Sequence, residues 1–253
     1  MTRAKNGYVL VYTLWMLSLL STVLFSVSTS LSTLYRRDKI ERDRVAFVYE
    51  AHAVAKLSLW RLLNSYPPAY PGLLSLPYET KVKIQKREYL VRIDAEDGNL
   101  PASKLSKDEW ERFLISFVGD RRVAEKIAID IHNYGRIRSI NELYWIVGED
   151  KFPRMREYLS NHAPRLNVNY ASDLALYAIG LSRSDIELIK LERSNGPVDI
   201  RRISNPANES IILRYIVSTP RPTYYRVKVQ MMEPVRMDLT LILSPDMQIL
   251  DRL

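Results

Sequence analysis

No charged side chain occurs from Tyr8 to Leu34, and this stretch constrains the fold more than any other feature. As an α-helix, about 27 residues would extend for roughly 40 Å, which exceeds the roughly 30 Å hydrocarbon core of a bilayer. Apolar residues are densest from Tyr8 to Phe25. A short basic segment with Arg3 and Lys5 precedes the run. The sequence therefore predicts an N-terminal membrane helix.

A cleaved secretory signal does not fit this segment. Such signals have apolar cores of about 7 to 15 residues and a small-residue cleavage site, whereas this run is longer and Ser26-Val27-Ser28 is a poor site. An uncleaved signal anchor stays open, because basic residues flank both ends of the run and charge alone orients it weakly. These residues are Arg3 and Lys5 before the run and Arg36, Arg37 and Lys39 after it.

The apolar run continues directly into an amphipathic helical pattern. Beyond Ile40, apolar residues recur at helical spacing between charged ones, and Pro67-Pro68 marks the end of the helix. We therefore expect one transmembrane and stalk helix over residues 8–66. The recurring apolar residues are Phe47, Val48, Ala51, Val54, Ala55, Leu59, Leu62 and Leu63.

The rest of the sequence combines strand and helix patterns. Alternating residues over 78–98 predict a β-hairpin that Asp97-Gly98-Asn99 closes. The order of elements implies an α+β fold, in which an antiparallel sheet (78–98 and 207–253) is interrupted by an inserted all-α domain (99–206). Helices are expected at 107–118, 121–133, 140–147, 154–161, 171–179, 183–193 and 198–203, and later strands at 210–218, 224–231, 237–243 and 247–250.

The segment Gly7-Tyr8-Val9-Leu10-Val11-Tyr12 resembles the processing site of type IV pilin-like proteins. The resemblance implies that residues 1–7 are a leader, that prepilin peptidase cuts between Gly7 and Tyr8, and that Tyr8 is then N-methylated. Most of this superfamily has Glu at the fifth mature position, where this chain has Tyr12. The K-type minor pseudopilins of type II secretion, the general secretion pathway protein K family, are the members that lack this Glu.

A physical reason connects the missing Glu to filament assembly. A carboxylate in the bilayer is costly unless it is paired, and in pilins the Glu can pair with the terminal amine of the subunit above. The first subunit of a filament has no such neighbour, so Tyr12 suits that position.

Three internal segments extend the resemblance over nearly the whole chain. Together with the leader they follow the order of the K-type family, which has a helical domain inserted into a pilin-like sheet. The segments are Ile93-Asp94-Ala95-Glu96-Asp97-Gly98-Asn99-Leu100, Ser139-Ile140-Asn141-Glu142-Leu143 and Leu166-Asn167-Val168-Asn169-Tyr170-Ala171.

The resemblance implies a non-enzymatic minor pseudopilin at the tip of a type II secretion pseudopilus, which primes assembly and supports protein export across the outer membrane. The implied partners are I-type and J-type minor pseudopilins, the major pseudopilin, prepilin peptidase and inner-membrane lipid, with no small-molecule substrate. The implied location is the bacterial inner membrane, crossed once, with a cytoplasmic N-terminus and a periplasmic C-terminal domain.

The calcium site common in this family is not expected here. Family members carry a long acidic loop before the S-x-x-E-L segment, whereas this chain has only Asn133-Tyr134-Gly135-Arg136-Ile137-Arg138. Asp130 and Glu142 flank this loop, but calcium needs six to eight oxygen ligands. We therefore expect no metal or other cofactor.

DNA binding, as in a competence pseudopilin, is the alternative function. Residues 135–143 and 196–202 each resemble half of a helix-hairpin-helix, whose loop amides can hold a phosphate. Neither copy has a clean Gly-apolar-Gly loop, and the net charge of +8 is spread among acidic residues in every segment. Nucleic acid is therefore not the expected partner. The contacting residues in this alternative would be Arg136, Arg138, Arg201 and Arg202.

Catalytic residue types form no recognisable pattern. The chain has no cysteine, which excludes disulfides and thiolate chemistry. Its three histidines are His52, His132 and His162, and no nucleophile, base and orienting group can be named together with any of them. We expect no enzymatic activity.

Overall fold

The computed structural model describes residues 3–66, 72–85, 87–232 and 236–252, with side chains from residue 11 onward. The first element is α1 (Arg3–Ser65), so the expected long helix is present and ends just before Pro67-Pro68. The chain divides within α1 into two units, Met1–Glu50 and Ala51–Leu253.

In the first unit, α1 exposes every described side chain from Val11 to Ile40. Its threonine hydroxyls donate hydrogen bonds to carbonyls one turn earlier, as from Thr22 to Ser18 at 2.9 Å and from Thr33 to Thr29 at 2.9 Å. Such internal bonds reduce the cost of placing a hydroxyl in lipid. Within the described part of the chain, α1 is the one helix that is long and apolar enough to cross a membrane, with a mean hydropathy of 1.6.

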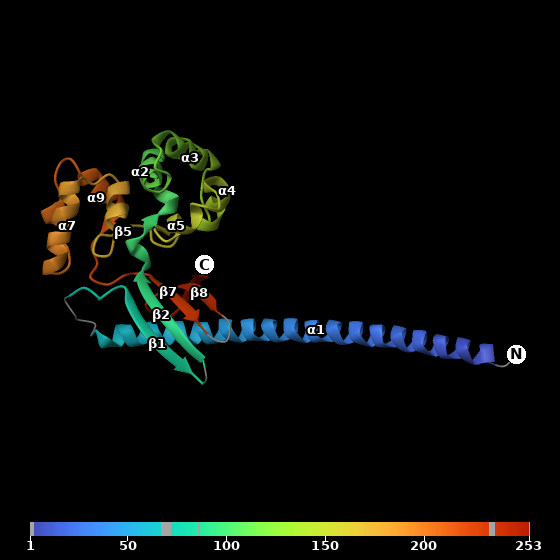
Figure 1. The fold of residues 1–253 in the computed structure, drawn as a ribbon. Helices are drawn as coiled ribbons and strands as arrows, with labels where there is room; N and C mark the ends of the chain where they lie inside the picture. The colour runs from blue at the N-terminus through green and yellow to red at the C-terminus, as the bar shows by residue number, and fades with distance from the viewer. Residues whose placement is uncertain (1–2, 67–71, 86, 233–235, 253) are drawn as a thin grey trace. The chain divides into compact units, whose positions relative to one another are not determined.

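The second unit contains a five-stranded antiparallel sheet in the order β1-β2-β7-β8-β9 (Figure 1). The predicted hairpin is present as its first two strands. In the centre of the sheet, Val229 of β7 lies between Val91 of β2 and Leu239 of β8. The strands are β1 (Tyr78–Ile84), β2 (Arg87–Ala95), β7 (Tyr225–Met231), β8 (Met237–Leu243) and β9 (Ile249–Arg252).

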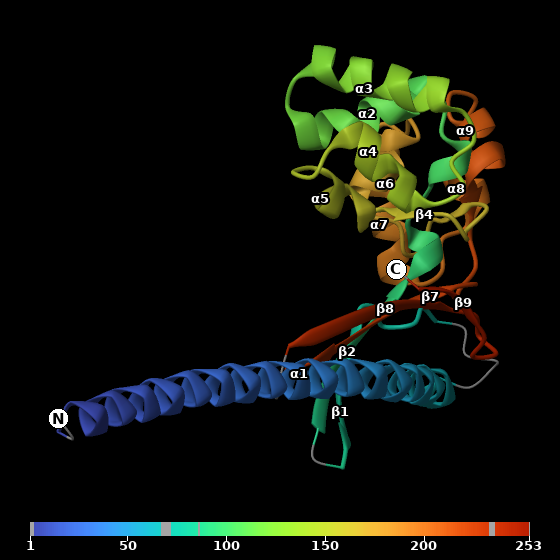
Figure 2. The same ribbon diagram turned by 90° about the vertical axis from the view of Figure 1, so that its right-hand side faces the viewer.

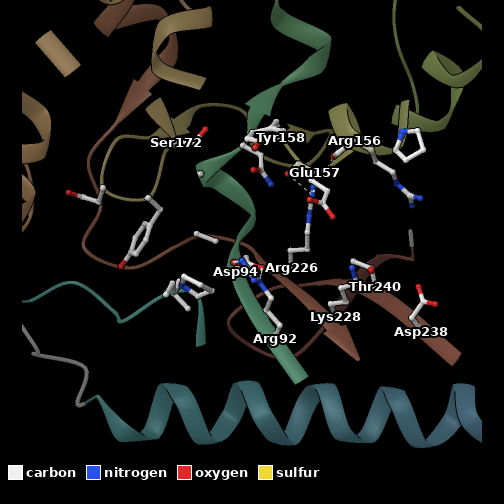
Figure 3. A pocket seen from close by; sticks show the side chains of 18 of the residues that line it. Arg92, Asp94, Arg156, Glu157, Tyr158, Ser172, Arg226, Lys228, Asp238 and Thr240 are labelled. Carbon is white, nitrogen blue, oxygen red and sulfur yellow. Dashed lines mark hydrogen bonds and ion pairs between the residues drawn. The ribbon is translucent and has the colours of Figure 1, made fainter. Parts of the chain in front are cut away.

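The two faces of the sheet differ in chemistry. Alternate residues of a strand point to opposite faces, and those of β2 and β7 alternate between buried apolar and more exposed polar side chains. The part of α1 from Ala51 onward runs along the sheet on the side away from Arg226, Lys228 and Thr240 (Figures 2 and 3). It buries Ala51, Val54, Ala55, Leu59 and Leu62, each at most 1% exposed.

Residues 96–217, the helical block, lie between β2 and β7 in the sequence. Local signals set the first helices: Ser106 and Glu109 form a capping box on α2, Gly119 ends α2 at a φ of 72°, and Asp120 caps α3. Trp110 and Phe113 of α2 are buried in the core of the helical block. The helices are α2 (Lys107–Val118), α3 (Arg121–Tyr134), α4 (Tyr144–Val147), α5 (Phe152–Arg156), α6 (Asp173–Ala178), α7 (Arg183–Asn195), α8 (Ile200–Ile203) and α9 (Glu209–Tyr215), with 3-10 turns η1 (Glu96–Gly98), η2 (Ala102–Lys104) and η3 (Ile140–Leu143).

The expected strand over residues 210–218 is wrong, because α9 occupies Glu209–Tyr215 and only β6 (Ile216–Val217) is extended. Asn205 and Asn208 start this helix, since the side chain of each accepts a hydrogen bond from the backbone amide of the other. Its buried residues, Ile212 and Tyr215, follow helical spacing.

The expected helix over residues 154–161 is also misplaced. α5 ends at Arg156, and β4 (Leu159–Ser160) then pairs in parallel with β3 (Leu100–Pro101). A second parallel pair joins β5 (Leu166–Asn167) to β6. The block inserted in the sheet therefore contains short strands and is not purely α-helical. The segment Asp97-Gly98-Asn99 does not close the hairpin, because Asp97 and Gly98 lie in η1, which follows β2, and Asn99 is the C-cap of that turn.

Candidate assembly elements and the junction between sheet and helical block

The proposed processing site lies in the first helix. The backbone of Gly7 and Tyr8 belongs to α1, whereas Met1 and Thr2 and the side chains of residues 3–10 lie outside the described part. Cleavage between Gly7 and Tyr8 and methylation of Tyr8 stay predictions. Tyr12, at the position of the family Glu, is 62% exposed on α1, and no acidic residue occurs in the sequence from Tyr8 to Leu34.

The four arginines of the DNA-binding alternative are exposed and lie in two separate segments. Arg136 and Arg138 lie in the loop between α3 and η3, and Arg201 and Arg202 lie in α8. The amide of Arg138 donates to Glu142 at 3.0 Å, and that of Arg201 donates to Asp199 at 3.0 Å. Both amides therefore already donate hydrogen bonds within the chain, which does not favour phosphate binding.

The three histidines, and the carboxylates Asp130 and Glu142 that flank the loop at residues 133–138, are also dispersed. Glu142 caps a backbone amide, His162 contacts Asp251 at 3.0 Å, and His132 is exposed. Burial above all, helped by Arg252 and Lys56, lowers the pKa of His52. Among the described residues, no group of three or more His, Asp or Glu side chains is arranged to hold a metal ion.

Arg226 joins the sheet to the helical block, and sequence analysis did not single it out. Its Nε donates to Glu96 at 2.6 Å, and its Nη atoms donate to the carbonyls of Glu157 at 2.9 Å and Leu159 at 2.7 Å. The side chains of Arg226 and Glu96 are 11% and 1% exposed. A buried ion pair needs further hydrogen bonds to offset its desolvation, and the two carbonyls supply them.

Two of the segments that carry the family resemblance meet beside this ion pair. Asp97 accepts hydrogen bonds from the amide of Thr223 at 2.9 Å and from Asn167 at 3.4 Å. Burial raises the pKa of Asp97 from 3.8 to about 6, although these hydrogen bonds oppose the rise. A Cβ atom on Gly98 would lie 2.8 Å from the carbonyl oxygen of Tyr170. The two segments therefore fix the helical block to the end of β2.

A cleft of about 700 Å³ lies between the polar face of the sheet and the α5 region of the helical block (Figure 3). The sheet contributes five charged residues and Thr240, and the segment around α5 contributes Arg156, Glu157 and Tyr158. Nothing in the sequence marked this cleft. The charged residues from the sheet are Arg92, Asp94, Arg226, Lys228 and Asp238.

Comparison with known proteins identifies the fold. No family model and no curated protein matches the sequence. The structure is similar to a chain in the crystal structure of the GspK-GspI-GspJ complex from the enterotoxigenic Escherichia coli type 2 secretion system. The TM-score is 0.62 at 12% sequence identity, over 86% of this chain and 98% of that chain. The chain therefore has the α+β fold of a component of this secretion complex, with an apolar N-terminal helix, an antiparallel sheet and a large helical insertion.

Proposed function

We propose that the protein is a K-type minor pseudopilin of a type II secretion system. The observation that carries this proposal is the structural likeness to a chain of the GspK-GspI-GspJ complex, which spans nearly the whole length of that chain. The same architecture was expected from the leader and the three internal segments. The structural likeness and the resemblance of the leader and internal segments both support a non-enzymatic component of a filament.

Features of α1 and of the helical block support a position at the tip of the filament. Without a carboxylate among its membrane residues, α1 needs no terminal amine from a subunit above it. A block of about 120 residues between β2 and β7 is too bulky to repeat comfortably at every position of a thin filament. The protein would therefore cap the tip of the pseudopilus and prime its assembly with I-type and J-type pseudopilins, ahead of the major pseudopilin. This position supports protein export across the outer membrane.

The proposed location is the inner membrane. The charge-free part of α1 would span the bilayer, prepilin peptidase would process the cytoplasmic N-terminus, and the unit from Ala51 to Leu253 would lie in the periplasm. Removal of the seven-residue leader would leave the membrane helix attached, because the cut precedes the apolar run.

Co-purification of the full-length, tagged protein from its native membrane tests the proposal. We expect I-type and J-type pseudopilins to be retained in a complex with it. A stoichiometry in which this chain is the most abundant, evenly spaced filament subunit would contradict the tip assignment.

Tyr12 offers a matched pair of variants for the same proposal. Tyr12→Glu should reduce the amount of protein exported to the medium, because it places an unpaired carboxylate in the membrane. Tyr12→Phe keeps the aromatic ring and should leave export unchanged. Normal export by Tyr12→Glu would mean that a subunit above can pair with the carboxylate, and thus that this chain does not occupy the tip.

A further inference from the structure

The cleft above the polar face of the sheet has a floor and a roof of different origin. Its floor is a row of residues that lie directly opposite one another across β2, β7 and β8, namely Arg92, Lys228 and Thr240. Its roof consists of Arg156, Glu157 and Tyr158. Arg226 ties this roof to the sheet, so the cleft is a fixed feature of the junction.

Positive charges outnumber negative ones along its lining. Five cationic residues face three carboxylates, which are Asp94, Glu157 and Asp238. Three of the cationic residues are already engaged by the protein. Arg92 is paired with Asp94 at 2.9 Å, Arg226 with Glu96 at 2.6 Å, and Arg193 donates to the carbonyls of Val168 and Ala171.

Arg156 and Lys228 are the two remaining cationic residues. Within the described ranges, neither side chain has a hydrogen bond or an ion pair. Arg156 is half-buried, and burial first, then the charge of Arg226, lowers its pKa, with Asp251 opposing. A partly desolvated guanidinium carries five N–H donors, and leaving them unpaired is costly. Both residues line the same cleft, Arg156 from its roof and Lys228 from its floor (Figure 3).

We propose that this cleft binds a carboxylate group carried by an acidic peptide segment of another protein, with Arg156 and Lys228 as the two contacting cations. This inference goes beyond the proposed function and holds for any partner that carries such a segment. A guanidinium pairs with a carboxylate through two parallel N–H···O bonds, and Thr240 adds a hydroxyl donor on the floor.

The other lining residues favour a peptide over nucleic acid. Pro77, Pro153 and Tyr158 supply apolar surface beside the charged groups, as in sites that bind a few residues of a chain. A volume of about 700 Å³ falls in the range of roughly 300 to 1,000 Å³ that holds small ligands, which suits a short segment and not a duplex.

Binding of a labelled hexaglutamate peptide to the full-length protein in detergent tests the proposal, with fluorescence anisotropy as the readout. The double variant Arg156→Gln/Lys228→Gln should weaken binding by at least about 10-fold, the size expected for loss of one charge-assisted hydrogen bond. The control is Arg154→Gln/Lys83→Gln, which removes the same net charge from exposed residues that do not line the cleft. It should bind the peptide as the wild type does.

Each other outcome overturns the proposal. An equal loss in both double variants would show general electrostatic attraction. No binding to the wild type would show that the cleft takes no acidic segment. Equally tight binding of free succinate would show a site for small anions, and displacement of the peptide by duplex DNA at lower concentration would favour nucleic acid. Thermal unfolding of the wild type and of both double variants confirms that the comparison is made between folded chains.

Discussion

Replacing Asp97 with asparagine should remove a pH-dependent loss of stability from the junction between the sheet and the helical block. The Asp97 side chain is 2% exposed, and its Oδ1 atom is buried without a hydrogen-bond partner among the described residues. Its other oxygen accepts hydrogen bonds from Thr223 and Asn167. Burial outweighs these bonds, so the pKa of Asp97 rises from 3.8 to about 6.

The sign follows from proton linkage. Well below pH 3.8, Asp97 is neutral in both the folded and the unfolded chain, and its titration costs no stability. As the pH rises from about 4 to about 6, the unfolded chain loses the proton first, and the folded state becomes less stable relative to it. A pKa difference of about 2 units, at about 1.4 kcal/mol per unit, gives a loss of about 3 kcal/mol by pH 7.

Denaturant titrations of the full-length protein in detergent, at pH values between 4 and 7, measure the effect. The free energy of unfolding of Asp97→Asn minus that of the wild type should rise by about 3 kcal/mol across this window. Asp97→Ala is the matched control. It should show the same pH dependence, shifted to lower stability by a constant amount, because alanine cannot accept the hydrogen bonds from Thr223 and Asn167. A difference between Asp97→Asn and wild type that stays flat with pH would refute the reasoning.

Three further substitutions test the same junction and the core of the helical block. Arg226→Gln should lower the free energy of unfolding by about 3 to 5 kcal/mol, because it leaves Glu96 buried without its cation; a loss below 1 kcal/mol in denaturant titration would contradict this. Gly98→Ala should cost about 1 to 3 kcal/mol, because its Cβ would lie 2.8 Å from the Tyr170 carbonyl oxygen, and an unchanged Tm would show that the backbones separate freely. Tyr215→Phe should cost about 1 to 3 kcal/mol, because Glu109 loses a buried hydroxyl donor; equal stability of variant and wild type in urea would show that the bond contributes nothing.

Local patterns predicted the elements whose ends are set by nearby residues. The strand pattern in residues 224–231 and 237–243 predicted β7 and β8 within one residue. The bounds of α2 were predicted correctly, since its capping residues Ser106, Glu109 and Gly119 lie at or next to its own ends in the sequence. The architecture of a sheet interrupted by helices followed from the order of these patterns.

Elements that depend on distant contacts were missed. The run Ile211-Ile212-Leu213 has strand propensity, but Tyr215 bonds to Glu109, which is 106 residues away, and this packing favours a helix. Alternation in β7 placed Arg226 on the polar face of the sheet, where a solvated side chain would be expected. Its partner Glu96 lies 130 residues earlier, so neither the ion pair nor the cleft could be predicted from the sequence.

The pseudopilin assignment depends most directly on the state of the N-terminus, which can be measured by sequencing and intact mass of the protein from its native membrane. We expect a chain that begins at Tyr8, carries a methyl group on its amine and lacks residues 1–7, while Gly7→Val should keep the leader, because the protease needs close approach to the backbone there. A protein that retains Met1, or one that begins near Ser28, would contradict the pseudopilin assignment.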